Sequence, residues 1–420
     1  MAFLKKKMVL MWPFIRVLFI CVLARSAGGA EEWSRFRGAN GSGQSEAATI
    51  PVEWTVEDYN WQVPLPGIGH SSPVISGDRV VVTSGDPEGA TRHVLCLRCS
   101  DGSQIWSRKF PSLPHHFHAR NSYASSTPAL DGQHVFFMWA TPDAHHLVAL
   151  DLEDGHTVWK INLGKFKSQH GFATSPIVHR DAVIVANEQL GESFLAAYDC
   201  KTGTEKWRCR REGGVQTAYS VPCVFRGEDG VEQLIFHSTA HGISGLNPET
   251  GELLWSIDVF KKRCVSSPVI AGGFVFGSSG QGGSGEALVA VKPGNGSTRK
   301  PEVAYEIKKS APYVVTPVAY RDWIFVWHDS GVVSCHDVAD GKLRWRQRVG
   351  RGFSGSPIRV GENLYGITED GQVAVLAAEP EFRLLAKNDL GEPSRATPAV
   401  ADGRLYLRTE SKLISLGGDL

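Results

Sequence analysis

The segment AYDCKTGTEKW at residues 197–207 decides the fold, because its spacing returns along the chain. It ends a short apolar strand at Asp199, turns at Gly203 and reaches Trp207 four residues after that glycine. Asp or Thr followed by Gly favours a hairpin turn, since Gly adopts the positive φ that other residues resist. The same glycine-to-tryptophan interval gives Trp106, Trp159, Trp207, Trp255 and Trp345. We interpret these tryptophans as structural side chains that fill the wedge between neighbouring sheets.

A second motif opens each repeat. A small or hydroxyl-bearing residue, then proline, then an apolar strand recurs eight times, with the prolines at Pro73, Pro128, Pro176, Pro222, Pro268, Pro317, Pro357 and Pro398. Successive prolines stand 40 to 55 residues apart. This interval is typical of a four-stranded propeller blade and exceeds that of a leucine-rich or hexapeptide repeat. The sequence therefore predicts an all-β chain of eight blades.

The two ends of the chain are predicted to share one blade. The eighth repeat stops after a third strand near residues 413–416, and a missing strand leaves an open edge that all-β folds avoid. Trp61 lies 12 residues before Pro73, the same interval as from Trp345 to Pro357. We expect residues 60–65 to supply the missing strand. The prediction is an eight-bladed β-propeller of four-stranded antiparallel blades over residues 59–420, with Trp61 as another structural tryptophan.

Two repeats depart from the pattern. The fifth has Lys300 four residues after Gly296, where tryptophan is expected, and the seventh has lost both the turn and the tryptophan. A column of small residues precedes the turns by six positions. We interpret this column as the place where adjacent blades approach most closely; its members are Cys96, Ala149, Ala197, Gly245, Ala290 and Cys335.

The N-terminus has the layout of a secretory signal peptide over residues 1–30. Five basic and no acidic residues surround an apolar run, and Gly28-x-Ala30 is the cleavage motif. A retained anchor is the alternative, although Pro13 and Arg16 interrupt the apolar run. Residues 31–58 then form an N-terminal leader. We expect an exported monomer, periplasmic or extracellular, with no integral membrane span after cleavage.

Charge argues against nucleic acid as a partner. The whole chain has 44 basic and 44 acidic residues, and removing the five basic residues of the signal segment leaves 39 against 44. Binding to a phosphate backbone needs clustered Lys and Arg, which a weakly acidic chain without a basic run does not offer. The partner is therefore expected to be a protein or a small ligand at a propeller face.

The repeats resemble the PQQ-like repeat of quinoprotein alcohol dehydrogenases and of the outer membrane assembly factor BamB, and segment 197–207 carries the resemblance most clearly. The leader WSRFRGANGSG at residues 33–43 resembles that of a group of secreted bacterial PQQ-like repeat proteins. The resemblance implies the propeller fold. Quinoprotein dehydrogenases hold PQQ with Ca²⁺ and usually an adjacent Cys-Cys pair, and no two cysteines are adjacent here. No cofactor is therefore predicted, with PQQ and calcium as the alternative.

The candidate ligand site is one mouth of the central channel. Residues just before each repeat proline start the innermost strands and are expected to converge there; they are His70, Asn121, Tyr123, His170, Tyr219, Tyr313, Phe353 and Arg395. Ends of second strands are expected to join them: Glu188, His237, Gln281, His328, Asp329 and Glu369. Such a mixture of polar and aromatic side chains is typical of a binding pocket, and a polar mouth filled by water is the alternative.

Two further features suggest chemistry. His116 and His118 share a face in extended chain and are candidates to begin a metal site, although no carboxylate lies near them in sequence. Cys96-x-x-Cys99 has the spacing of a redox pair, but Cys96 belongs to the small-residue column and Cys99 falls on the opposite face of the strand. Seven cysteines remain in the mature chain, so at least one thiol is expected to be free.

The favoured function is a non-catalytic binding or scaffolding module, similar in architecture to BamB, and no catalytic residue is assigned. A PQQ-dependent dehydrogenase is one alternative. A small-ligand-binding, carbohydrate-binding or hydrolytic protein that uses the channel mouth is another.

Overall fold

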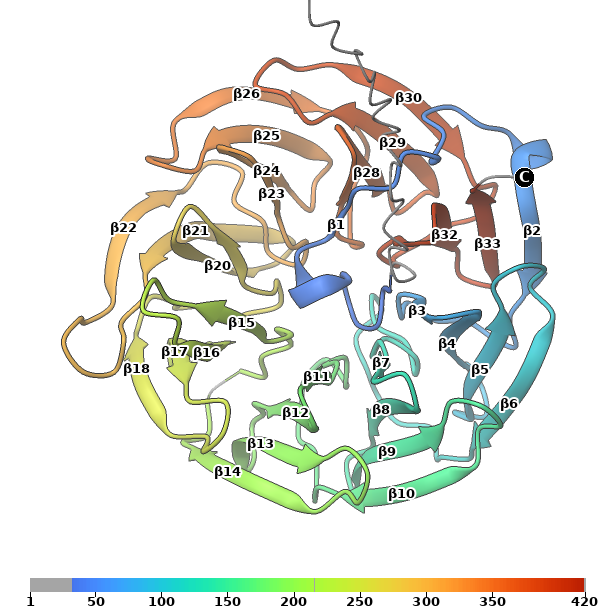
Figure 1. Ribbon diagram of the computed structural model, residues 1–420, viewed down its shortest axis with the longest axis horizontal. Coiled ribbons are helices and arrows are strands. Elements are labelled where there is room, and N and C mark those ends of the chain that lie inside the picture. Colours follow the sequence, from blue (N-terminus) through green and yellow to red (C-terminus); the bar gives the residue numbers. More distant parts are fainter. Residues whose placement is uncertain (1–31, 215, 419–420) are drawn as a thin grey trace, which may run out of the picture.

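The computed structural model describes residues 32–214 and 216–418. They form eight sheets arranged in a ring, which confirms the predicted eight-bladed β-propeller (Figure 1). The predicted signal peptide lies outside the described residues. Within those residues, no helix has both the length and the apolar character needed to cross a membrane.

The first four blades run in sequence order, each from the channel outward. Blade 1 comprises β3 (Val74–Ser76), β4 (Arg79–Gly85), β5 (Arg92–Arg98) and β6 (Gln104–Phe110). Blade 2 comprises β7 (Ala129–Leu130), β8 (His134–Ala140), β9 (His145–Asp151) and β10 (Thr157–Asn162). Blade 3 comprises β11 (Ile177–His179), β12 (Ala182–Asn187), β13 (Ser193–Asp199) and β14 (Glu205–Arg211). Blade 4 comprises β15 (Cys223–Arg226), β16 (Glu232–Ser238), β17 (Gly242–Leu246) and β18 (Leu253–Ile257).

The last four blades complete the ring. Blade 5 comprises β19 (Val269–Ala271), β20 (Phe274–Gln281), β21 (Ser284–Lys292) and β22 (Glu302–Ile307). Blade 6 comprises β23 (Val318–Tyr320), β24 (Trp323–Trp327), β25 (Val332–Asp337) and β26 (Leu343–Arg348). Blade 7 comprises β27 (Ile358–Val360), β28 (Asn363–Ile367), β29 (Gln372–Ala377) and β30 (Leu384–Asp389), and blade 8 comprises β31 (Ala399–Ala401), β32 (Arg404–Arg408) and β33 (Lys412–Gly417).

The N-terminal segment closes the ring, as predicted. Strand β2 (Tyr59–Pro64), which follows the short 3-10 helix η2 (Val56–Asp58), pairs antiparallel with β33 and becomes the fourth strand of blade 8. Its Trp61 lies opposite Ser415. Strand β1 (Gln44–Ser45) also joins the ring by pairing in parallel with β27, so blade 7 has a fifth strand at the channel that the repeat pattern did not predict.

The repeated tryptophans join each blade to the next. The indole of Trp207 in blade 3 is 7% exposed and donates a hydrogen bond of 2.9 Å to the carbonyl oxygen of Pro248 in blade 4. Gly251 has a φ of 70°, and a Cβ on it would lie 2.4 Å from the Trp207 ring. The turn glycine is therefore required for its backbone conformation and also because the indole of the preceding blade occupies the space beside it.

The small residues of the column lie opposite the ring at the tryptophan position of their own blade, whereas the spacing in the sequence predicted a close approach of adjacent blades. Ala197 on β13 is the cross-strand partner of Trp207 on β14, and the same pairing joins Cys96 to Trp106 and Cys335 to Trp345. A small side chain opposite each indole leaves room for the ring on that face of the sheet. The column thus accommodates the tryptophan of its own blade.

The two irregular repeats replace the missing indole in different ways. In blade 5, Tyr305 lies opposite Ala290 and donates a hydrogen bond to the carbonyl oxygen of Val338, so Tyr305, not Lys300, holds the tryptophan position. In blade 7, Ala386 stands at this position. There the indole of Trp54, from the N-terminal segment, stacks on Tyr365 of β28 with ring centroids 6.4 Å apart.

Hydrogen bonds between neighbouring blades explain the hydroxyl residue before six of the eight prolines. The Ser72 N–H donates to Thr127 Oγ1 at 2.9 Å, and the Thr127 N–H donates to Ser175 Oγ at 2.9 Å. The pattern continues from Val221 to Ser267 and then through Thr316, Ser356 and Thr397. Each of these hydroxyls satisfies a buried backbone donor of the preceding blade, so this motif connects the innermost strands around the channel.

Candidate functional site

The leader closes one end of the central channel. Residues 33–45, including the 3-10 helix η1 (Ala39–Gly41), cross the middle of the ring (Figure 1). Trp33 is 1% exposed, and its backbone exchanges hydrogen bonds with Ile75 of blade 1 at 3.1 and 2.9 Å. The Ser34 carbonyl oxygen accepts a hydrogen bond from the N–H of Leu130 in blade 2. The leader is therefore fixed to the innermost strands on one side of the ring.

Two buried arginines fix the leader to the other side. Arg35 donates to the carbonyl oxygen of Pro222 in blade 4 at 2.5 Å. Burial lowers the pKa of Arg37 to about 9, so its guanidinium remains charged at neutral pH. Carbonyl oxygens from the leader and from blades 6 and 7 accept its hydrogen bonds; they belong to Gly41, Ser42, Thr316, Pro317 and Pro357. Phe36, between the two arginines, lines the cavity above them.

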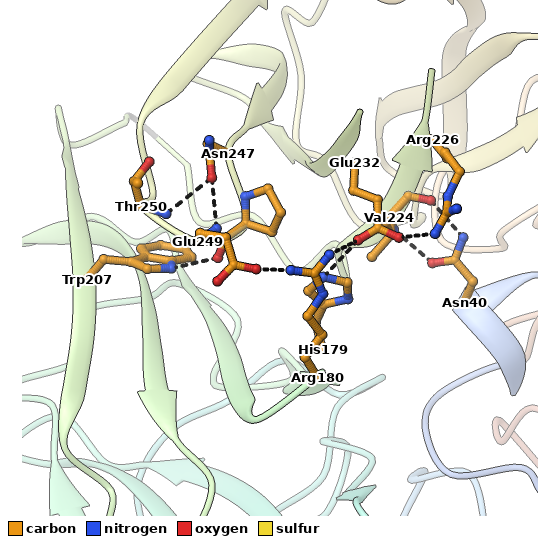
Figure 2. A network of polar contacts seen from close by, with 11 residues as sticks. Asn40, His179, Arg180, Trp207, Val224, Arg226, Glu232, Asn247, Glu249 and Thr250 are labelled. Atoms are coloured by element: carbon orange, nitrogen blue, oxygen red, sulfur yellow. Dashed lines mark hydrogen bonds and ion pairs between the residues drawn. The ribbon is translucent and has the colours of Figure 1, made fainter. Parts of the chain in front are cut away.

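The tip of the leader contacts blade 4 beside a network of charges (Figure 2). Asn40 donates to the carbonyl oxygen of Val224 at 2.8 Å and accepts from its N–H at 2.7 Å. Nearby, Glu232 of blade 4 pairs with Arg226 at 2.5 Å and with Arg180 of blade 3 at 2.8 Å. Most of these charged groups are partly exposed, so the network adds little stability, and the Asn40 contact is the part that orients the leader.

Above this floor the channel contains a cavity of about 680 Å³. Seven residues predicted from the sequence line it: His70, Asn121, His170, Tyr219, Gln281, Tyr313 and Arg395. His118, predicted as a metal ligand, also lines it, together with Arg120, Gln169, Gln216 and Arg263. No Asp, Glu, Lys or Cys among the described residues belongs to the lining. The cavity therefore carries arginine charges with no acidic side chain in its wall.

One wall is built around Arg263, which precedes blade 5. This side chain is 6% exposed, and its Nη1 donates to Tyr313 Oη and His170 Nε2, both at 3.3 Å, while Nη2 donates to Gln169 Oε1 at 3.0 Å. All three acceptors are neutral groups. Within the described part of the chain, no ion pair includes Arg263, and its Nε is buried without a hydrogen-bond partner.

The facing wall contains His70 and Arg395. Burial, and then the charges of Arg408 and Arg395, lower the pKa of His70 to about 3. Burial, and then Arg263, lower the pKa of His170 to about 4. Both imidazoles are neutral near pH 7. The positive charge of the mouth therefore comes from its guanidinium groups.

Tyr313 is placed by a carboxylate outside the cavity. Asp329 is 4% exposed and accepts the N–H groups of Tyr313 at 2.8 Å and Val314 at 2.9 Å. Burial raises the pKa of Asp329, whereas these two backbone donors lower it. The prediction that Asp329 lines the mouth is wrong: Asp329 is not among the lining residues, and its carboxylate positions the bend at residues 313–315 that carries Tyr313.

Two other predicted residues lie away from the cavity. Tyr123 belongs to a turn at residues 123–124 that rotates its ring into a separate small pocket, where it contacts His115 and Arg92. His328 interacts with Ser330 and Ser284 and does not reach the lining. Both predictions assumed an extended backbone, and turns break that assumption in these loops.

The remaining mouth candidates also have other partners. Glu188 pairs with Arg211 at 3.1 Å, and His237 packs against Phe260. Phe353 is a core residue beside Trp327, and Glu369 accepts a hydrogen bond of 2.5 Å from Ser354. None of them is among the residues that line the cavity in the described chain.

Four residues of the cavity wall were not predicted from the sequence: Arg263, Gln216, Gln169 and Phe36. Arg263 lies five residues before Pro268, and Gln216 lies six before Pro222. Six of the correctly predicted residues lie within the same short distance before a repeat proline. The same spacing could therefore have identified Arg263 and Gln216 as well. Phe36 gave no such signal, because the leader reaches the channel only through contacts with blades far away in sequence.

The histidine pair does not assemble a metal site in the described residues. His116 is exposed, and His118 stacks on His170 with ring centroids 4.8 Å apart. A group of three metal-binding side chain types, Asp151, Asp154 and His156, occurs in the hairpin turn of blade 2, where Asp151 and Asp154 accept the hydrogen bonds of that turn. The seven described cysteines are free thiols.

Two buried histidines outside the mouth give a pH prediction. His145 packs between Phe166 and Phe172, His237 packs against Phe260, and burial lowers the pKa of each imidazole from 6.5 to about 3. Below about pH 6.5 these two histidines bind protons in the unfolded chain but stay neutral in the folded chain. The free energy of unfolding therefore decreases as the pH is lowered. Each histidine is expected to remove about 2 kcal/mol from the free energy of unfolding at about pH 5.

Denaturant unfolding at about pH 7 and about pH 5 measures this effect. Replacing both buried residues, His145→Phe and His237→Phe, is expected to flatten the pH dependence, whereas the exposed control His156→Asn is expected to leave it unchanged. An identical pH dependence in the double variant and the wild type would contradict the assignment.

A ring of eight blades joined by turn glycines and tryptophans defines a PQQ-like repeat β-propeller. The family model described as outer membrane protein assembly factor BamB matches residues 52–191, 100–312 and 302–381. The chain belongs to this family. BamB of Yersinia pestis is 24% identical over 302 residues, which cover 68% of this chain and 72% of that protein.

Other relatives match shorter parts. Subunit 1 of the methanol dehydrogenase of Methylobacterium organophilum is 36% identical over 86 residues, 20% of this chain and 14% of that protein. The tetrathionate hydrolase of Acidithiobacillus ferrooxidans is 26% identical over 195 residues, 44% of this chain and 36% of that protein. The chain thus spans well under half of these two enzymes.

Solved structures share the fold at low identity. BamB from Moraxella catarrhalis has a TM-score of 0.58 and 14% identity, covering 86% of this chain and 98% of that one. The quinohemoprotein alcohol dehydrogenase from Comamonas testosteroni has a TM-score of 0.67 and 14% identity, covering 93% of this chain and 81% of that one. At this identity the likeness shows the propeller alone.

Proposed function

We propose that this protein is an exported, non-catalytic β-propeller that acts as a binding module and takes a small ligand at its channel mouth. The cavity carries the proposal. Its volume of about 680 Å³ lies within the range of roughly 300 to 1,000 Å³ that is typical of small-molecule sites. The leader crosses the middle of the ring (Figure 1), and its Phe36 lines the cavity, so the leader forms part of the pocket wall.

We propose further that the protein binds its ligand without PQQ or calcium as a cofactor. Ca²⁺ prefers several oxygen ligands, with carboxylates prominent among them, and the lining described above has none. It also contains no cysteine. These two facts support a binding role over the dehydrogenase activity named for the methanol dehydrogenase, which this chain resembles over 20% of its length.

Export and a protein-binding role have support from the relatives. The name of BamB places that protein in the assembly of outer membrane proteins, and the sequence of this chain predicts a signal peptide ahead of the propeller. We propose that the mature protein is a periplasmic or extracellular monomer. A scaffolding role at the propeller face is the second candidate, because the similarity to BamB extends over 72% of that protein.

A thermal-shift screen tests the binding role. The mature protein is screened against neutral sugars, acidic sugars, simple carboxylates, amines and PQQ, the last with and without Ca²⁺. A matched variant, Ala173→Trp, fills the cavity at a residue of its lining. We expect at least one compound class to raise the melting temperature of the wild type and not of the variant, and we expect no calcium-dependent response to PQQ. If no class distinguishes the two proteins, the channel mouth is not a binding site and the scaffolding role gains support.

A further inference from the structure

Arg263 is a buried charge that has no counterion among the described residues. An arginine side chain carries a positive charge, and a buried charge is costly unless an opposite charge compensates it. Its three hydrogen-bond acceptors, Tyr313, His170 and Gln169, are neutral, and its Nε has no partner. It lies in the wall of a cavity large enough for a ligand. An anion in this cavity would supply the missing charge.

His170 adds a donor beside this charge. Arginine has no acceptor atom, so the contact between Arg263 Nη1 and His170 Nε2 makes Nε2 the acceptor. The proton of the neutral imidazole is therefore on Nδ1, and this atom is buried without a partner. Arg263 Nε and His170 Nδ1 are thus two donors without an acceptor on residues that line the cavity, and the oxygens of an anionic ligand would supply acceptors for them.

Gln216 points to a second property of the ligand. Its Oε1 is buried without a hydrogen-bond partner, and Gln216 lines the same cavity. An amide oxygen accepts a hydrogen bond, so the part of the ligand that meets it must donate one. A hydroxyl group provides that donor. The rings of Tyr219, Tyr313 and Phe36 line the cavity beside these polar groups and supply flat apolar surface.

We propose that the channel mouth binds a small hydroxylated carboxylate of the chemical class of uronic and aldonic acids, with the carboxylate on Arg263 and His170 and a hydroxyl on Gln216. This inference rests on the proposed binding role of the cavity. It makes Arg263 the residue that selects for charge and Gln216 the residue that selects for hydroxyl groups.

Calorimetric titration of the mature protein with D-glucuronate, D-galacturonate and D-gluconate tests the inference. D-glucose serves as the neutral comparison and acetate as the comparison without hydroxyl groups. We expect at least one of the three acids to bind at least about tenfold more tightly than glucose and acetate. Arg263→Gln is expected to remove most of this preference, while Arg383→Gln, an exposed arginine paired with Glu379 on the outside of blade 7, is expected to leave it unchanged.

A second variant keeps the test decisive if Arg263→Gln fails to fold. Gln216→Leu keeps the charge of the mouth and is expected to weaken the hydroxylated acid at least about fivefold while leaving acetate unchanged. Equal binding of glucose and glucuronate, or full affinity for the acid in Arg263→Gln, would overturn the inference and leave the binding role intact. No binding of any acid, together with a screen that shows no difference between wild type and Ala173→Trp, would overturn both.

Discussion

Replacing Trp207 with alanine is expected to lower the free energy of unfolding by about 3 to 5 kcal/mol. The indole is 7% exposed, covers Gly251 of the next blade and donates its N–H to the Pro248 carbonyl oxygen (Figure 2). Alanine would leave a cavity between two blades and an unsatisfied carbonyl oxygen. Denaturant unfolding of the mature protein measures the loss, and Leu253→Ala, on the outer strand β18 of the next blade at a side chain that is 46% exposed, is the matched control.

Two further variants separate the causes. Trp207→Phe keeps an aromatic ring but removes the indole N–H, and is expected to cost about 1 to 2 kcal/mol. Gly251→Ala places a methyl group within 2.4 Å of the indole on a residue with a φ of 70°. Gly251→Ala is expected to lower the free energy of unfolding by about 2 kcal/mol or more. In a protein that already carries Trp207→Ala, the same substitution is expected to lower it by less, because only the backbone strain of about 1 to 2 kcal/mol remains. Additive losses in the double variant, or an unchanged stability of Trp207→Ala, would refute this packing.

The sequence predicted the blades well because their motif is local. The turn, the glycine and the tryptophan of a blade lie within a few residues, so spacing alone reveals them. The prediction failed in the fifth repeat, where a longer connection between Lys292 and Glu302 moves the fourth strand and brings Tyr305 opposite Ala290. Counting four residues from Gly296 therefore gave Lys300. The pairing of β21 with β22, and not the distance from the glycine, determines which side chain contacts the next blade.

The site was harder to predict because its parts come from distant blades. Proximity to a repeat proline identified six of the wall residues, since every innermost strand starts at the channel. It misplaced Tyr123, where a turn redirects the side chain. The second criterion, the end of a second strand, misplaced Asp329, whose carboxylate accepts hydrogen bonds from backbone N–H groups. Neither criterion could reveal the floor, because the contact of Arg37 with Pro357 joins residues 320 positions apart, and no interval in the sequence predicts such a pairing.

Removing residues 32–66 is expected to abolish cooperative folding. A chain that begins at Gly67 lacks β2, so the last blade loses the strand that pairs with β33 from Tyr59 to Pro64. It also loses the buried side chains of Trp61 and Leu65. Trp61 alone is expected to contribute about 3 to 5 kcal/mol, and typical domains have only about 5 to 15 kcal/mol of stability in total. The exposed edge of β33 would in addition favour aggregation.

A chain that begins at Ala47 is the matched control, because it removes the part of the leader that crosses the channel and keeps Trp54 and β2. The carbonyl oxygens of Pro317 and Pro357, which accept hydrogen bonds from Arg37, would then bind water in the open channel. Losing these hydrogen bonds to Arg37 would therefore lower the free energy of unfolding only slightly. We expect this chain to unfold cooperatively at a lower temperature. Thermal unfolding followed by circular dichroism and sedimentation of both chains makes the comparison. If the chain that begins at Gly67 is as stable as the one that begins at Ala47, β2 does not close the ring; if both match the full mature protein, the leader does not stabilise the channel floor either.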